Sequence, residues 1–106
     1  MNADGFMVRV SRGGLHVSAE DYERYFDGIS GIVLIRRDSD LLILPVRLAQ
    51  AGGYILKRKN LAGDRVAHAP DFFRASGIAD ESDREIEVTW DNTQGGLVGR
   101  GAFFAY

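Results

Sequence analysis

Two stretches of this chain resemble each other, and this internal similarity limits the possible folds more than any other feature. One stretch is GDRVAHAPDFFRASGI, Gly63 to Ile78, and the other is GGLHVSAEDYERYFDGI, Gly13 to Ile29. Both contain the pattern Asp-aromatic-any-Arg, starting at Asp21 and at Asp71, and both end on Gly-Ile. Short matches that need one-residue gaps can also arise by chance. The secondary-structure pattern therefore has to decide whether the chain is a diverged duplication.

The first half is typical of two hairpins with a helix between them. Ser18 lies three residues before Asp21, which is an N-cap pattern, and Gly28 can end a helix of about two turns in a left-handed conformation. β-branched and other apolar residues around turn-forming residues predict the hairpins. The strands expected in this half cover residues 6–10, 15–17, 31–37 and 41–46.

The second half repeats the same order. Pro70 suits the first position of a helix because its missing N–H has no partner there, and Gly77 can end that helix. Residues 84–90 alternate, so Ile86 and Val88 share one face with Trp90. The strands expected in this half cover residues 54–59, 65–68, 84–90 and 97–98.

The length of 106 residues suits one domain and is too short for two good cores. We therefore predict an α+β, mainly β fold: a small pseudo-two-fold β-barrel built from two ββαββ repeats with two short helices. The single domain spans residues 1–106, with repeat 1 at about 6–46, a linker at 47–53, repeat 2 at about 54–99 and an aromatic tail at 101–106.

Composition and charge limit the cellular locations and partners that we expect for this chain. The chain has 13 basic and 15 acidic side chains and no cysteine, which excludes disulfides and thiolate chemistry and gives no overall attraction to phosphate. No basic stretch precedes an apolar run at the N-terminus, and the longest apolar stretch, residues 41–46, is far too short to span a bilayer. We expect a cytoplasmic protein without membrane association.

The second half resembles the AbrB and MraZ swapped-hairpin family. The residues that carry the resemblance are Arg65, Val66, Pro70, Arg74, Gly77 and Ile78. In that family two ββαββ units intertwine into a small β-barrel, from two chains or from one. The resemblance implies DNA binding through basic side chains around the first hairpin of a unit.

The residues that could carry catalysis or bind a metal form no recognisable set. His16 and His68 each lie near a predicted helix start, but their spacing to acidic residues matches no ligand motif and no nucleophile accompanies them. The paired glycines at 13–14 and 95–96 suit hairpin turns and lack the rest of a phosphate-binding motif. We therefore expect no cofactor, no metal and no enzymatic activity.

Basic side chains recur at matching places in the two halves. They precede or follow the first hairpin turn of each half, where they could contact phosphates, although charges on exposed strands also protect sheet edges. The candidate DNA-binding residues are Arg9, Arg12, Lys57, Arg58, Lys59 and Arg65.

Two apolar segments exceed what one small barrel can enclose. Alternate residues of the strand at 41–46 must face outward, and the tail brings three aromatic residues to the last four positions. The tail is either a last strand that completes the barrel or a surface for a partner. The candidate interface residues are Leu42, Leu44, Phe103, Phe104 and Tyr106.

These patterns favour a small non-enzymatic binding module that interacts with a protein partner, as an accessory subunit or by self-association. The alternative is an AbrB/MraZ-like DNA-binding regulator or antitoxin, with nucleic acid as the partner. A missing catalytic constellation is the reason to place binding ahead of catalysis.

Overall fold

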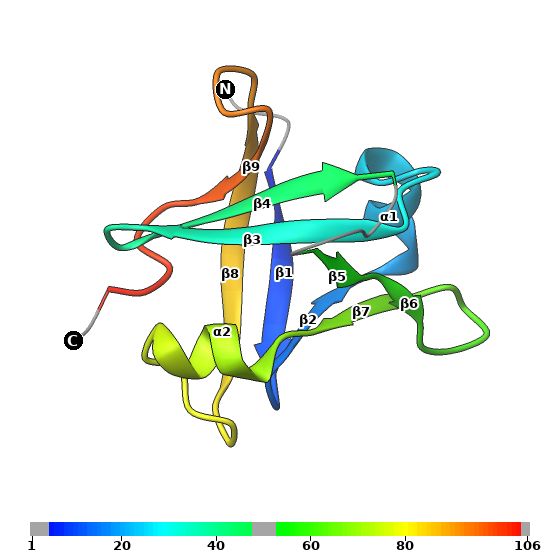
Figure 1. The fold of residues 1–106 in the computed structure, drawn as a ribbon. Helices are drawn as coiled ribbons and strands as arrows, with labels where there is room; N and C mark the ends of the chain where they lie inside the picture. Colours follow the sequence, from blue (N-terminus) through cyan, green and yellow to red (C-terminus); the bar gives the residue numbers. More distant parts are fainter. Residues whose placement is uncertain (1–4, 48–52, 105–106) are drawn as a thin grey trace.

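A computed structural model describes residues 5–47 and 53–104, which form a nearly closed antiparallel β-barrel with two short helices (Figure 1). The predicted fold class is confirmed. The elements are β1 (Gly5–Ser11), β2 (Gly14–Val17), α1 (Ala19–Tyr25), β3 (Gly31–Arg37), β4 (Asp40–Val46), β5 (Tyr54–Ile55), β6 (Lys57–Arg58), β7 (Arg65–His68), α2 (Pro70–Ala75), β8 (Asp83–Asp91) and β9 (Gly96–Gly99).

The barrel closes through one interrupted strand. The sheet order is β5-β3-β4-β9-β8-β1-β2-β7-β6, and only Leu56 separates β5 from β6. The strand expected over 54–59 is therefore in place but broken, because Leu56 is buried and donates its N–H to the carbonyl of Ser30 at 2.9 Å. One end of this run pairs with β3 and the other pairs with β7, so both ends of the sheet order meet.

The strand pairings follow a pseudo-two-fold pattern. The hairpin β1–β2 corresponds to β6–β7, the hairpin β3–β4 corresponds to β8–β9, and the pair β1–β8 corresponds to β5–β3. The pairs β2–β7 and β4–β9 join the two halves across the middle. The ββαββ order thus appears in both halves, while its origin by duplication stays a prediction.

Both helices begin as the sequence indicates, and α2 ends with its C-cap directly before Gly77, whereas α1 ends at Tyr25 with Phe26 as its C-cap, before Gly28 is reached. The Ser18 hydroxyl accepts a hydrogen bond from the Asp21 N–H at 3.1 Å, and Pro70 is the first residue of α2. After the helices, Gly28 and Gly77 have φ of 77° and 92°, which a side chain would disfavour. The two helices lie apart on the barrel (Figure 1), and Phe26 and Phe73 place fully buried rings beneath them.

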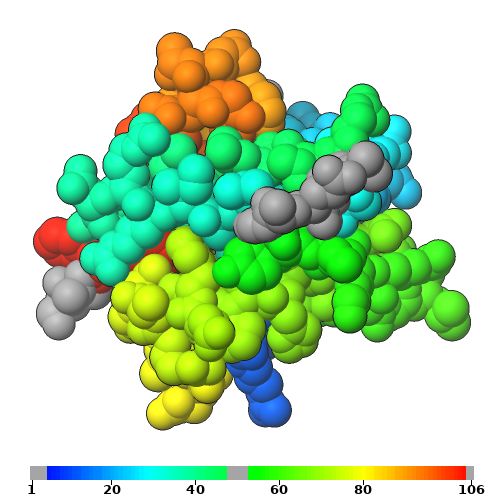
Figure 2. Space-filling model, in the orientation of Figure 1, coloured from blue at the N-terminus to red at the C-terminus, as the bar shows by residue number. Residues whose placement is uncertain are grey.

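Several turns protrude from the surface of the barrel, among them the β8–β9, β6–β7 and β1–β2 turns (Figure 2). Figure 2 shows the β8–β9 turn in orange at one side and the β6–β7 turn in green at another. Leu61, in the β6–β7 turn, is 94% exposed. The intervening surface is formed largely by β3, β4 and α2 in this view.

The tail after β9 forms turns instead of the last strand considered from the sequence. Gly101 has a φ of 67°, which bends the chain away from an extended path. Ala102 and Phe103 are nevertheless buried, and the Phe103 ring lies 6.0 Å from that of Phe72. Tyr106 lies outside the described residues, as does most of the predicted linker at 47–53.

Candidate functional site

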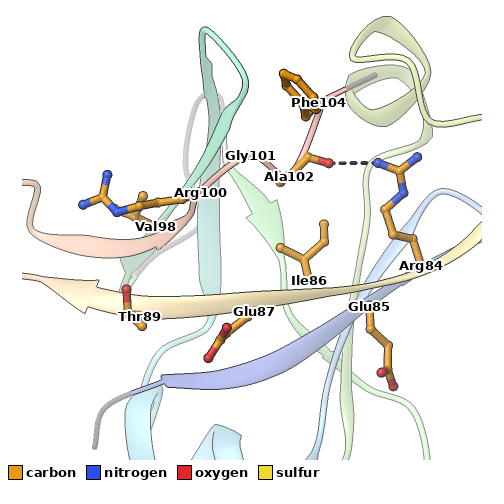
Figure 3. A pocket seen from close by; sticks show the side chains of 10 residues that line it. All are labelled: Arg84, Glu85, Ile86, Glu87, Thr89, Val98, Arg100, Gly101, Ala102 and Phe104. Atoms are coloured by element: carbon orange, nitrogen blue, oxygen red, sulfur yellow. Dashed lines mark hydrogen bonds between the residues drawn. The ribbon is translucent and has the colours of Figure 1, made fainter. Parts of the chain in front are cut away.

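A cleft of about 640 Å³ lies between β8, the end of β9 and the turn that follows it (Figure 3). Its volume falls within the range of about 300–1,000 Å³ that is common for ligand sites. The cleft opens to solvent, so it can admit a chain as well as a small molecule.

The cleft exists because β8 is much longer than its partner β9. Along one edge, β8 pairs with β1 over seven positions, from Gly5 opposite Thr89 to Ser11 opposite Asp83. Along the other edge, β8 pairs with β9 over only three positions, from Thr89 to Asp91. The edge of β8 before Thr89 therefore has no strand partner among the described residues.

The turn after β9 is bound by the backbone and side chains of the β3–β4 turn. The N–H of Gly101 donates to Asp40 Oδ1 at 2.8 Å, and the N–H of Phe103 donates to the carbonyl of Ser39 at 2.9 Å. The guanidinium of Arg36 also lies 5.6 Å from the centre of the Phe103 ring. These contacts direct the tail toward β3 and β4, and the space beside β8 stays open.

The two faces of β8 present different chemistry to the cleft. Figure 3 shows Ile86 and Arg84 pointing toward the tail, and Arg84 Nη1 donates to the carbonyl of Ala102 at 2.8 Å. Glu85 and Glu87 point in the opposite direction. The cleft therefore has an apolar floor at Ile86, one end limited by Arg84, and two carboxylates along its outer side.

At its other end the cleft reaches Arg100. The guanidinium of Arg100 lies 3.7 Å from the carboxylate of Asp91, and the Arg100 side chain is 72% exposed. The hydroxyl and N–H of Thr93 hydrogen-bond to the Asp91 carboxylate and are the main reasons that the pKa of Asp91 is below its usual range. This end of the cleft thus carries a cation that already faces an anion.

The predicted interface residues fall into different environments. Leu42 and Phe103 are buried within this chain, Leu44 is half-buried, and Phe104 is 55% exposed and lines the cleft. Leu41 and Ile43 are fully buried, so the outward set on β4 is Leu42 and Leu44. Among the predicted interface residues that the structure describes, Leu44 and Phe104 are the two with surface left for a partner.

The outward residues of β4 continue into the cleft. Leu42 lies opposite Val98 on β9, and Val98 lies opposite Thr89 on β8. Directly opposed residues share one face of a sheet, with Cβ atoms about 4.5–5.5 Å apart. Val98 and Thr89 both line the cleft, so β4 and the cleft share one continuous outer face.

The candidate DNA-binding residues are only partly brought together. Arg9, His16, Val66 and Lys57 lie opposite one another in a row across β1, β2, β7 and β6. Arg9 donates to both carboxylate oxygens of Asp83, at 2.8 and 2.5 Å. Arg9, at one end of this row, is thus already paired with the Asp83 carboxylate.

The other predicted basic residues have separate roles. Arg58 donates to the carbonyls of Asn60 and Leu61 within its own turn. The guanidinium of Arg65 lies 4.1 Å above the Tyr22 ring, and Arg12 is in the β1–β2 turn with a φ of 52°. The structure does not collect the six basic side chains into one patch.

A smaller hollow of about 200 Å³ adjoins His16. Burial, and next the nearby Lys59 ammonium, lower the pKa of His16. Lys59 Nζ is 2.9 Å from His16 Nδ1, so the neutral ring accepts a hydrogen bond from the ammonium. In residues 5–47 and 53–104 no three His, Asp or Glu side chains gather as metal ligands.

Sequence reasoning missed the cleft, although a signal for it was present. The alternation that predicted β8 runs over residues 84–90, whereas the partner strand was expected only at 97–98. A long strand beside a short one leaves part of its edge unpaired. That inequality in length was the available indication of an open site at Glu85–Glu87.

Comparisons with protein-family models, with curated proteins and with solved structures found no match. Neither helix in the described part of the chain has the length and hydropathy needed to cross a lipid bilayer.

Proposed function

We propose that this chain is a non-enzymatic protein-interaction module that binds an extended segment of a partner protein along the open edge of β8. The observation that carries the proposal is the unpaired part of β8 next to a cleft of about 640 Å³. An exposed strand edge offers N–H and C=O groups to which a second chain can add a strand.

The dimensions of the edge suit a short peptide. Arg84 and Glu87 are about 10 Å apart along the strand, because a strand rises about 3.3 Å per residue. The floor at Ile86 and Ala102 can accept a small apolar side chain from an added strand. Phe104 at the rim offers an exposed ring that can cover such a strand.

The continuous outer face strengthens the case for a protein partner. Val98 connects the cleft to Leu42 and the half-buried Leu44 on β4. Because Leu42 and Val98 are only 3% and 4% exposed, a partner segment that leaves the cleft in this direction can bury further apolar surface only at Leu44. Binding is favoured over catalysis because no nucleophile and base lie in hydrogen-bond contact among the described residues that line the cleft.

DNA binding by an AbrB/MraZ-like regulator is the second candidate function. It is favoured by the row that places Arg9 and Lys57 on one face, with Lys59 beside His16. It ranks second because Asp83 engages Arg9, while Arg58 folds back onto its own turn. Phosphate binding also predicts affinity that falls steeply with salt, which separates the two functions.

The test is a selection of random linear peptides displayed on phage against the immobilised protein, followed by amide hydrogen exchange with the selected peptides. Strand addition should protect the alternate backbone amides within residues 84–88 that point away from β1, and amides of the β6–β7 turn at 60–63 serve as the internal control. Sedimentation of the protein alone accompanies the experiment. The proposal is wrong if the selected peptides leave the β8 amides unprotected, or if the protein alone dimerises and protects them.

A further inference from the structure

The unpaired edge of β8 carries a regular charge pattern on its outer face. Glu85 and Glu87 are two residues apart, so both side chains lie on the same side of the strand. Both are exposed, and both line the cleft. No salt bridge within the described residues reaches either carboxylate.

The neighbouring strand neutralises these carboxylates only in part, since the Arg9 charge attracts Glu85 and Glu87 has no cation opposite it. On β1, Met7 lies opposite Glu87 and Arg9 lies opposite Glu85. The Arg9 guanidinium is bound through two hydrogen bonds by Asp83, which also lowers its availability to Glu85. No strand among the described residues pairs with Glu85 or Glu87 on the free side, although the backbone of Gly99 lies close to the Glu87 carbonyl.

A second copy of this chain is a poor occupant for that edge. In an antiparallel pair of two β8 edges centred on Ile86, Glu85 of each copy would face Glu87 of the other. Like charges directly opposite each other in a sheet are destabilising. The same pair of glutamates favours an added strand with cations at those positions.

We infer that the segment bound by this cleft carries basic side chains at alternate positions, opposite Glu85 and Glu87, with a small apolar residue between them over Ile86. The inference rests on the proposed function. Its physical basis is the cross-strand pairing of opposite charges. Arg100 does not cancel this preference, because it lies at the far end of the cleft and faces Asp91.

The test uses three blocked synthetic peptides of equal length in which Val alternates with Lys, with Thr or with Glu. Affinity is measured by calorimetry at about 50 mM salt, and the binding position is read from the β8 amide signals in NMR spectra. We expect the Lys peptide to bind roughly three- to ten-fold more tightly than the Thr peptide, and the Glu peptide to bind most weakly. Higher salt should reduce these differences, since the charges are exposed.

Variants assign the preference to the two glutamates. Glu85→Gln with Glu87→Gln should abolish the advantage of the Lys peptide over the Thr peptide, and Glu85→Lys with Glu87→Lys should favour the Glu peptide. The matched control is Glu23→Lys with Asp27→Lys, which changes net charge equally at exposed positions around α1. The control variant should still bind the Lys peptide more tightly than the Thr peptide.

The outcomes separate this inference from the proposed function. If all three peptides shift the β8 amides with equal affinity, the charge preference is wrong and strand addition stands. If the Gln variants keep the Lys preference, the two glutamates are not its source and the inference is wrong. If none of the peptides shifts the β8 amides, both the preference and strand addition by these segments fail.

Discussion

The two hairpins at corresponding places in the two halves, β3–β4 and β8–β9, differ in how far their strands stay together. β3 and β4 pair over seven positions, from Gly31 opposite Val46 to Arg37 opposite Asp40. β8 and β9 pair over three. The same topology thus gives a fully paired hairpin in one half and an open strand edge in the other.

The close packing of β9 explains part of this difference. A Cβ atom at Gly96 would lie 2.5 Å from the Ile43 carbonyl oxygen, so β9 approaches the backbone of β4 more closely than a side chain allows. A Cβ atom at Gly99 would lie 2.8 Å from a methyl group of Ile86. Glycines let β9 fit between β4 and β8, and the chain then bends away toward the β3–β4 turn.

The complete hairpin binds the tail that follows the shorter one. The β3–β4 turn binds the tail through Asp40 and Ser39, and the tail places Phe103 against Phe72. Burial of this ring competes with continued pairing along β8. The part of β8 before Thr89 then pairs with β1 alone among the described strands.

The largest expected effect comes from removing the ring that holds the tail. Phe103→Ala should lower the free energy of unfolding by about 3–5 kcal/mol, because the ring is 6% exposed and its loss leaves a cavity. Urea unfolding measures the change. Phe104→Ala is the matched control and should cost less than about 1 kcal/mol, since that ring is 55% exposed. Equal effects of the two substitutions would show that the tail does not stabilise the barrel through Phe103.

The sequence predicted the repeated order of elements well because local signals specify it. Ser18, Pro70 and Gly77 mark helix ends through hydrogen-bonding and backbone preferences that act within a few residues. The alternation in β4 also identified two sets of residues, and the structure shows that Leu42 and Leu44 form the outer one.

The sequence predicted the site poorly because the cleft depends on long-range contacts. The path of the tail is decided by Asp40, which lies 61 positions from Gly101 along the chain. Whether Arg9 is free to bind phosphate depends on Asp83, 74 positions away. No local pattern reports such pairings. Residue type alone therefore suggested one basic patch, whereas in the structure the basic side chains are separated. Residue type also did not indicate the open edge of β8.

A smaller effect is expected at the contact that anchors the tail. Asp40→Ala removes the acceptor of the Gly101 N–H and should cost about 1 kcal/mol, a typical value for one hydrogen bond. Asp40→Asn keeps an oxygen at that position and should retain most of the stability. Hydrogen exchange at the Gly101 and Phe103 amides should accelerate in the Ala variant and not in the Asn variant. Unchanged exchange in both variants would mean that the turn after β9 holds its position without Asp40.

The smallest expected effect lies on the paired edge of β8, at the ion pair between Arg9 and Asp83. The hydrogen bonds from Arg9, and next its charge, hold the pKa of Asp83 below the usual value. A carboxylate with a lowered pKa in the folded state stabilises the protein above the unfolded-state pKa of about 3.9, and this contribution disappears as the pH falls through the folded-state value. Asp83→Asn should therefore lower the urea midpoint slightly at about pH 7 and have a diminishing effect below about pH 4.

Arg9→Gln should give the same pH dependence, and the double variant should add little to either single change, because each removes the same pair. Since both side chains are about half exposed, added salt should also reduce the difference at neutral pH. A deficit that persists unchanged into acid would show that Asp83 stabilises β8 by some means other than its charge.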